Sequence, residues 1–214
     1  MGRGRFITLE GGEGAGKSTQ ARTLAKSLAA AGLPVLLTRE PGGAPGAEAV
    51  RGLLLGRAWD GIAECLLHFA ARREHVARMI EPALAAGIWV VCDRFADSTM
   101  AYQVYGQGVP LPAFEAIAGA ALQGLRPDLT LMLEVPLDLG MARVTARGEV
   151  NRYDRLDADF HARVRDGFAA ILAAEPERCQ RIDASATTAE VAAAILASVA
   201  ARLPLPGPPC ADPA

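Results

Sequence analysis

Near its amino terminus the chain reads Gly11-Gly12-Glu13-Gly14-Ala15-Gly16-Lys17-Ser18-Thr19, directly after the apolar run Phe6-Ile7-Thr8-Leu9. This is the pattern G-x-x-x-x-G-K-[ST] between a predicted strand and a predicted helix, which is typical of a phosphate-binding loop. Glycines allow backbone angles that other residues avoid, so their N–H groups can turn inward around an anion. The pattern therefore predicts a ligand that carries phosphates, held by residues 11–19.

Two side chains of this loop have separate predicted tasks. Lys17 is expected to reach the outer phosphates, and the hydroxyl of Ser18 is expected to be a ligand of Mg²⁺. The helix that starts near Lys17 adds the positive end of its dipole. A glycine-rich turn without a ligand is the simpler interpretation, but it leaves the Lys-Ser pair at the start of the helix without a role.

The composition is that of an ordinary globular protein of one large domain or two small ones, with 214 residues, 51% hydrophobic and 21% charged. A net charge of −2 gives no reason to expect nucleic acid as a partner. No apolar run reaches the roughly 20 residues that a membrane span needs, and no signal peptide is recognisable. Cys65, Cys92, Cys179 and Cys210 show no metal-ligand spacing, and we expect reduced thiols in a cytoplasmic protein.

Apolar strand-like runs alternate with longer helical patterns along the chain. The predicted strands are 5–10, 34–38, 88–93, 128–135 and 179–183. The predicted helices are 17–31, 47–55, 61–85, 97–104, 111–124, 136–147, 157–174 and 187–202. This alternation predicts an α/β fold, a five-stranded parallel sheet with helices on both faces, in a single domain over residues 1–202. The Pro-rich residues 203–214 are expected to form a disordered tail.

Charged residues follow the second and third predicted strands, at the edge of a parallel sheet where ligands bind. Arg39 precedes the turn Pro41-Gly42-Gly43 and is expected to point into the ligand crevice. Asp93 closes the third strand, where a second carboxylate on the Mg²⁺ side belongs, and Arg94 offers a planar fork for a phosphate. The alternatives are a solvated arginine beside an ordinary turn and a structural Asp–Arg ion pair.

A polar helix start and an arginine-rich loop complete the candidate site. Ser98 and Gln103 could form hydrogen bonds with a base or a sugar, and Tyr102 could pack on a sugar, although polar residues at a helix start are usually caps. The loop within residues 143–157 contains Arg143, Arg147, Arg152 and Arg155. It is predicted to be a lid, about residues 147–157, that places a guanidinium on the transferring phosphoryl group, or else a solvated charged loop.

In this order the segments resemble the thymidylate kinases, P-loop kinases that phosphorylate dTMP, over about residues 5–202. The segments that carry the resemblance are residues 9–19, Arg39-Glu40-Pro41-Gly42-Gly43, Asp93-Arg94-Phe95 with Ser98, Ala101-Tyr102-Gln103, Arg126-Pro127-Asp128-Leu129-Thr130, and the lid from Arg147-Gly148-Glu149 to Asp154-Arg155-Leu156-Asp157. The resemblance implies the P-loop nucleoside monophosphate kinase fold, ATP as phosphoryl donor, Mg²⁺, dTMP as acceptor, and a homodimer.

On the donor side the resemblance implies that Lys17 holds the phosphates of ATP. Ser18 would bind Mg²⁺, and Asp93 would lie near the metal and the acceptor phosphate. Glu13 also belongs to the P-loop, but the resemblance implies that it lies beside the deoxyribose of the acceptor, dTMP.

On the acceptor side the resemblance implies that Arg39 and Arg94 hold the phosphate of dTMP. Tyr102 would crowd the 2′ position of the sugar and disfavour a ribonucleotide, while Ser98 and Gln103 would lie near the thymine.

The resemblance also locates a catalytic arginine, which the family supplies either from the P-loop or from the lid. Because the P-loop position is Gly14, the chain resembles the mostly bacterial form with a lid arginine. Arg147 and Arg155 are both candidates.

The family reads thymine with a stacked Phe and, four residues later on the same helix face, an Arg. Literal spacing gives Phe69 with Arg73, whereas counting back from the family-like segment that begins at Glu81 gives His68 with Arg72. We favour Arg72, with His68 or its neighbour Phe69 in the stacking position.

The predicted reaction is transfer of the γ-phosphoryl group of ATP to dTMP, giving dTDP and ADP. The nearest alternative is a kinase of another monophosphate, such as dUMP, UMP or CMP. A nucleotide-dependent switch ATPase that acts through partner proteins is a more distant one, and the sequence contains no guanine-reading Asn-Lys-x-Asp segment.

Overall fold

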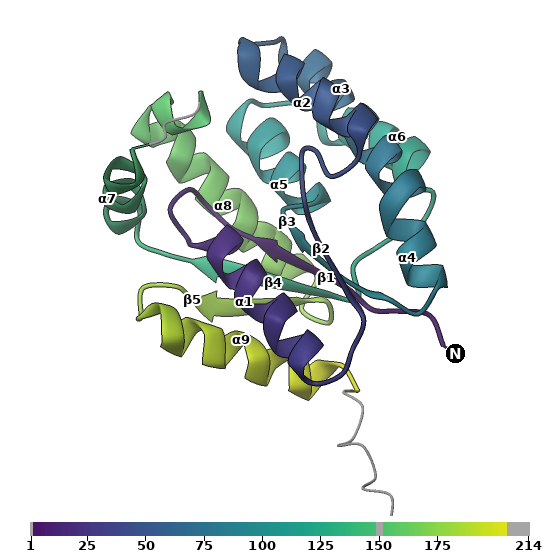
Figure 1. Ribbon diagram of the computed structural model, residues 1–214. Helices are drawn as coiled ribbons and strands as arrows, with labels where there is room; N and C mark the ends of the chain where they lie inside the picture. Colours follow the sequence, from purple (N-terminus) through teal and green to yellow (C-terminus); the bar gives the residue numbers. More distant parts are fainter. Residues whose placement is uncertain (1, 149–151, 205–214) are drawn as a thin grey trace, which may run out of the picture.

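The structure is a computed structural model that describes residues 2–148 and 152–204 (Figure 1). Its sheet has the order β2-β3-β1-β4-β5, and every pair of neighbouring strands is parallel. The strands are β1 (Phe6–Glu10), β2 (Val35–Arg39), β3 (Trp89–Asp93), β4 (Leu129–Glu134) and β5 (Cys179–Asp183). All five predicted strands are confirmed.

The predicted helices are also present. A wider π-helical turn divides the predicted helix 61–85, and the predicted helix 97–104 continues from a short α-helix into a π-helical turn. The helices are α1 (Lys17–Ala30), α2 (Pro45–Gly56), α3 (Gly61–His75), η1 (Val76–Ile80), α4 (Glu81–Ala85), α5 (Ala96–Thr99), η2 (Met100–Gly106), α6 (Leu111–Leu122), α7 (Leu137–Arg147), η3 (Tyr153–Arg155), α8 (Ala158–Ala174) and α9 (Thr188–Arg202). The π turn η1 ends just before Glu81-Pro82, where the proline interrupts the regular ladder of hydrogen bonds.

Helices cover both faces of the sheet, as Figure 1 shows for α1 and α9 on one side and α4, α5 and α8 on the other. On the first face Leu24 of α1 and Ile195 of α9 belong to one core with Ile7 and Leu131 of the sheet. On the second face the alternate strand residues are buried in two further apolar clusters, with η1 and α4 in one and with η2 and α8 in the other. A sheet buried on both faces explains why its strands read as continuous apolar runs.

The sheet order creates a crevice at the carboxyl ends of the central strands. β1 lies between β3 and β4, so the connections after β1 and after β3 lead to opposite sides of β1. In the strand register Leu9 pairs with Asp93, and Asp93 pairs with Arg39. The loop after β1 and the charged residues that close β2 and β3 therefore share one edge, at the point where the strand order reverses.

The boundary of the predicted tail is wrong by at least one residue. Leu203 is buried against Val199 and Ile195 in the core, and its N–H donates to the carbonyl of Val199 at 2.8 Å. An apolar residue directly after α9 can still reach the core. The prolines that follow Leu203 made the sequence look like a tail from that residue on. The rest of the tail prediction, from residue 205 on, lies outside the described residues.

Within the described parts of the chain, no helix is both long enough and apolar enough to cross a membrane.

Candidate active site

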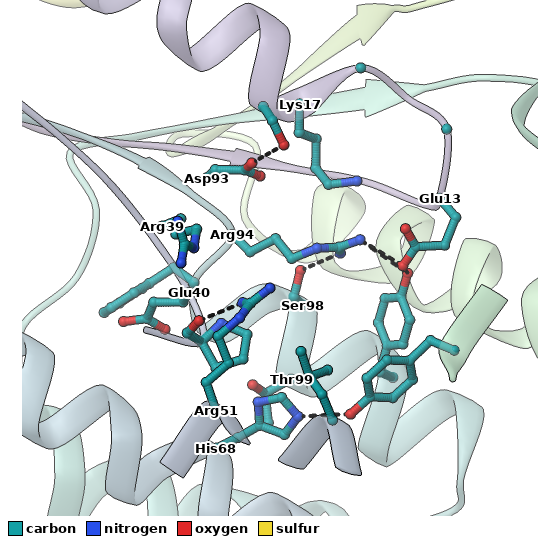
Figure 2. Close-up of a pocket in the computed structure, with 18 of the residues that line it drawn as sticks. Glu13, Lys17, Arg39, Glu40, Arg51, His68, Asp93, Arg94, Ser98 and Thr99 are labelled. Carbon is teal, nitrogen blue, oxygen red and sulfur yellow. Dashed lines mark hydrogen bonds and ion pairs between the residues drawn. The ribbon is translucent and has the colours of Figure 1, made fainter. Parts of the chain in front are cut away.

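A cavity of about 620 Å³ opens at the carboxyl ends of β1, β2 and β3 (Figure 2). The predicted site residues in its wall are Glu13, Gly14, Gly16, Lys17, Ser18, Thr19, Arg39, His68, Arg72, Asp93, Arg94, Ser98, Tyr102 and Gln103. Side chains that the sequence did not assign to the site also line it, among them Arg22, Arg51, Thr99 and Tyr153. The polar groups come from the P-loop, from two strand ends and from helices α2, α3, α5 and η2.

The P-loop needs its glycines for space as well as for conformation. Gly11 has a φ of 136°, and a Cβ there would lie 2.2 Å from the carbonyl oxygen of Leu133. Gly14 has a φ of 71°, and a Cβ there would lie 2.0 Å from the carbonyl oxygen of Gly140 in α7. No side chain fits at position 14, so a P-loop arginine is excluded on steric grounds.

Lys17 is the first residue of α1 and is almost fully buried in the cavity wall. Its Nζ donates to the carbonyl oxygen of Gly12 at 2.6 Å. Burial and the nearby charge of Arg94 lower the pKa of Lys17 to about 8. Among the described residues no side chain caps the start of α1, and its first turn has no acidic residue, so its first N–H groups remain available to an anion.

Ser18 and Asp93 bring two oxygen donors together beside Lys17. The Ser18 hydroxyl donates a short hydrogen bond to Oδ2 of Asp93. Such oxygens suit Mg²⁺, which usually keeps several waters and takes further ligands from substrate phosphates. The residues described contain no cluster of three or more His, Cys, Asp or Glu side chains that could hold a metal by themselves.

Arg94 is fixed by a network that links the P-loop to α5 and η2. Figure 2 shows its guanidinium pointing toward Glu13, with Ser98 beside it. Nη2 donates to Oε1 of Glu13 at 2.8 Å, Nη1 donates to the Ser98 hydroxyl at 3.0 Å, and the Tyr102 hydroxyl donates to the same Glu13 oxygen at 2.7 Å. Burial lowers the pKa of Arg94, but Glu13, Tyr102 and Asp93 outweigh it and leave the pKa raised. Arg94 therefore stays positively charged in the cavity.

A buried carboxyl that the sequence did not single out supports this arginine. Glu10 accepts from the backbone N–H of Phe95 at 2.7 Å and from the Ser98 hydroxyl at 2.5 Å. These bonds hold the segment around Arg94, whose φ of 72° is uncommon for a residue with a side chain. Burial and the charge of Asp97 raise the pKa of Glu10 to about 7. Ser98 thus links Glu10 to Arg94 and also lines the cavity, so its predicted contact with the base stays a prediction.

A second arginine missed in the sequence stands beside Arg39. Arg39 is exposed and pairs with Glu48 at 3.0 Å, whereas the half-buried Arg51 of α2 lines the cavity and donates to the carbonyl of Pro41 at 2.6 Å. Arg51 lies four residues after Ala47 and so on the buried face of α2. An arginine at a buried helical position was the signal that could have found it.

At the opposite end of the cavity His68 lies in the wall, as Figure 2 shows. Burial and the charges of Arg72, Arg152 and Arg94 lower the pKa of His68 to about 3, so its ring is neutral. The predicted alternative, Phe69, is wrong: it is buried against Phe114, with ring centroids 5.4 Å apart. Neighbouring helix residues project about 100° apart, so only one of the two rings can face the cavity.

Arg72 reaches the cavity and Arg73 does not. The Arg72 side chain is 2% exposed; Nε donates to Glu40 at 2.7 Å and Nη2 to the Thr99 hydroxyl at 3.0 Å. Its third nitrogen, Nη1, is a buried donor without a partner among the described residues. Arg73 instead forms an ion pair with Glu81 at 2.9 Å, away from the cavity.

Gln103 supplies a second unpartnered buried atom to the same end. Its Nε2 donates to Glu64 at 2.8 Å, and its Oε1 has no hydrogen-bond partner in the described structure. Arg72 and Gln103 both line the cavity, and each keeps one buried polar atom without a partner among the described residues: a donor in Arg72 and an acceptor in Gln103.

The two predicted lid arginines, Arg147 and Arg155, are placed differently. The side chain of Arg147 and residues 149–151 lie outside the described part. Arg155 is exposed in η3 and does not line the cavity. Arg143 of α7 does line it, and donates to the carbonyl of Ala184 at 2.8 Å. A lid segment near Tyr153, which also lines the cavity, closes the end near His68.

The five-stranded parallel sheet, covered on both faces and with a P-loop after β1, is the fold of the P-loop kinases of the nucleoside monophosphate class. The family model described as thymidylate kinase matches residues 9–195. The chain belongs to the thymidylate kinase family.

Similar proteins agree with this assignment. The thymidylate kinase of Gluconobacter oxydans is 53% identical over 213 residues, which cover 96% of this chain and 99% of the relative. That of Caulobacter vibrioides is 50% identical over 208 residues, covering 96% and 100%. The crystal structure of thymidylate kinase from Ehrlichia chaffeensis is 35% identical, has a TM-score of 0.78, and covers 92% of this chain and 99% of that one.

Proposed function

We propose that this chain transfers the γ-phosphoryl group of ATP to dTMP, giving ADP and dTDP for the synthesis of dTTP. One observation carries the choice of acceptor: the pair of unpartnered buried atoms, Arg72 Nη1 and Gln103 Oε1. Thymine presents the complementary edge, a carbonyl oxygen at C4 and a proton on N3. The fit supports a pyrimidine with an N3–H, and the family membership supports thymine.

The phosphate end supports a reaction that depends on positioning and on neutralising charge. The acceptor is a phosphate oxygen that is already anionic, so no strong base is required. Lys17 and the start of α1 would hold the phosphates of ATP, while Arg94 and Arg39 would hold the phosphate of dTMP. A lid arginine, Arg147 or Arg155, is proposed for the transferring group, and the cavity position of Arg143 makes it a third candidate.

Magnesium fits the oxygen pair of Ser18 and Asp93, which would hold it beside the phosphates. When bound, Mg²⁺ neutralises phosphate charge and orients the oxygens. Ser18 must then exchange its hydrogen bond to Asp93 for the metal.

The sugar and the base would lie between Tyr102 and α3. Tyr102 packs against Tyr153 and its hydroxyl donates to Glu13, so the ring is held in place, which supports the proposal that it crowds the 2′ position. The neutral ring of His68 is available for stacking on the base. A deoxyribonucleotide with a flat pyrimidine suits these side chains.

A kinase of another monophosphate remains the nearest alternative. Cytosine reverses both contacts, because N3 is an acceptor and the group at C4 is a donor. Uracil keeps both, and the missing methyl group is worth only about 1–3 kcal/mol, so dUMP should be a weaker substrate.

We also propose a cytoplasmic homodimer. Cys65, Cys92 and Cys179 are buried free thiols, which suits a reducing compartment. The amino-terminal part of α3 exposes Ile62 and Leu66, and apolar exposure of this kind suits a contact between two copies. Light scattering of the purified chain should give twice the mass of one chain.

The decisive test is a panel of acceptors, dTMP, dUMP, dCMP, UMP and CMP, with ATP and Mg²⁺, followed by the release of ADP. We expect release to depend on the acceptor and to be fastest with dTMP. Equal turnover of ATP with and without dTMP would overturn the proposal and favour a switch ATPase. A higher kcat/KM for dCMP would overturn the choice of base alone.

A further inference from the structure

Glu64 of α3 is a fully buried carboxylate just behind the base end of the cavity. Its side chain is 0% exposed, and it does not line the cavity. Oε1 accepts from Gln103 Nε2 at 2.8 Å, from Gln107 Nε2 at 2.9 Å and from the Tyr153 hydroxyl at 2.8 Å. Oε2 is in contact with the guanidinium of Arg152 in an ion pair. One buried carboxylate therefore joins η2, which lines the cavity, to Arg152 and Tyr153 before α8.

A carboxylate can only accept hydrogen bonds, so it dictates the orientation of every group around it. The Gln103 amide must turn its NH₂ toward Glu64, which leaves its Oε1 as an acceptor without a partner among the described residues. The ion pair between Oε2 and Arg152 holds the carboxylate from its other side and so keeps Oε1 facing these donors.

The same constraint passes through Tyr153 to His68. Tyr153 has a single hydroxyl proton and gives it to Glu64, so the contact of 3.1 Å between its oxygen and His68 Nε2 must be donated by the histidine. His68 is neutral, and its proton is therefore on Nε2 while Nδ1 is an acceptor. Two side chains at the base end of the cavity thus take their hydrogen-bonding polarity from Glu64.

We propose that Glu64 is a positioning residue that determines base specificity, because it fixes the polarity of the Gln103 amide together with Arg152 and Tyr153. It also orients His68, but stacking on that ring tolerates any base, so discrimination passes through Gln103. The inference rests on the proposed function and adds to it a residue that does not touch the substrate. Glu64, which does not line the cavity, would then be responsible for the preference for a base that carries a proton on N3.

The substitution Glu64→Gln separates this role from simple support of the fold. Arg152 should attract the new amide oxygen, which leaves the new NH₂ facing Gln103. Gln103 then gains by rotating its own amide, and its NH₂ turns toward the cavity, where it suits N3 of cytosine. Since one mispaired buried polar group is worth roughly 1–3 kcal/mol, the ratio of kcat/KM for dTMP to that for dCMP should fall about 10- to 100-fold.

Two further variants make the test specific. Gln107→Leu removes another donor from the same Glu64 oxygen without touching the groups at the cavity, so the ratio should stay within about threefold of wild type. In Gln103→Leu the ratio should fall, and adding Glu64→Gln to it should cause no further fall, because the rotating amide is gone. Thermal unfolding of each variant checks that it is folded.

The outcomes are distinguishable. An unchanged ratio in folded Glu64→Gln, with both substrates slowed equally, would overturn the inference, as would a fall of the same size in Gln107→Leu. Should Glu64→Gln not fold, an unchanged ratio in Gln103→Leu would overturn it, because Glu64 could not then act through Gln103. Wild-type protein that fails to phosphorylate dTMP would instead overturn the proposed function.

Discussion

The two ends of the cavity are built in opposite ways. At the phosphate end the protein's own groups are already paired: Lys17 with the carbonyl of Gly12, Ser18 with Asp93, and Arg94 with Glu13. At the base end the described residues leave Arg72 Nη1 and Gln103 Oε1 buried without partners. The phosphate end must exchange partners when ligands bind, whereas the base end only gains them.

This difference suggests that one end of the cavity provides binding affinity and the other end selects the acceptor base. Highly charged phosphates can displace the internal partners at one end because charge-assisted bonds are strong. At the other end a base with the wrong edge leaves a buried polar atom unsatisfied, which costs about 1–3 kcal/mol each time. We expect the phosphate end to control turnover and the base end to control the choice of acceptor.

The largest expected effect is at Lys17, and it tests whether the phosphate end controls turnover. Lys17→Met should lower kcat by about 10²- to 10³-fold or more, because it removes a nearly buried charge at the phosphate end, where charge is worth more than in water. Steady-state kinetics with saturating dTMP measures it, and Lys26→Met, an exposed lysine on the same helix, is the matched control. Near-normal turnover in Lys17→Met would remove Lys17 from the catalytic groups.

The next effect concerns the base end, at Arg72 and its neighbour. Arg72→Lys keeps a positive charge beside Glu40 but loses the forked donor, so KM for dTMP should rise about 10- to 100-fold while KM for ATP stays nearly constant. Arg73→Lys should leave both constants close to wild type, because Arg73 pairs with Glu81 outside the cavity. The reverse pattern would show that the base is read by the other helical register.

The phosphate end was also the more predictable end, for a physical reason. Its groups belong to residues 11–19 and to the two strand ends that close with Arg39 and Asp93, and parallel strands bring such ends to one edge. The same alternation of apolar runs predicted all five strands. Local sequence was sufficient wherever one turn or one strand end positions a side chain.

The base end depends on contacts between distant segments, and there the sequence left alternatives. A one-residue shift along α3 exchanges His68 for Phe69, and both are aromatic. Glu64 was missed although it precedes His68 and Arg72 by four and eight residues, a polar stripe on a mainly apolar helix. Its partners come from η2 and from the lid, so only the tertiary structure shows what it orients.

A smaller effect is expected beneath the phosphate end, at Glu10. Its pKa is raised from an ordinary 4.5 to about 7, so the folded state binds the proton more tightly than the unfolded state. This group therefore lowers the free energy of unfolding as the pH rises from about 4.5 to about 7, by an amount on the order of 1–3 kcal/mol. Glu10→Gln removes the titration and keeps an acceptor for the Phe95 N–H.

Chemical unfolding of both proteins at several pH values measures the difference. Relative to wild type, Glu10→Gln should become more stable between pH 4.5 and pH 7.5. A constant difference over that range would show that Glu10 has an ordinary pKa and that the network around Arg94 does not depend on its protonation.

The smallest expected effect is the uptake of at most one proton, and it tests the exchange of partners at Lys17 directly. Its pKa of about 8 reflects burial beside Arg94, and bound phosphates should restore a value near the ordinary 10.5. Binding of ATP should then take up a proton, from nearly none at pH 7 to about one per site at pH 9. Calorimetry in buffers of different ionisation enthalpy measures this uptake, and Lys17→Met should abolish its rise with pH. An uptake that does not depend on pH would mean that Lys17 is already fully charged before ATP binds. The phosphate end would then need no change of protonation on binding, and in this respect it would not differ from the base end.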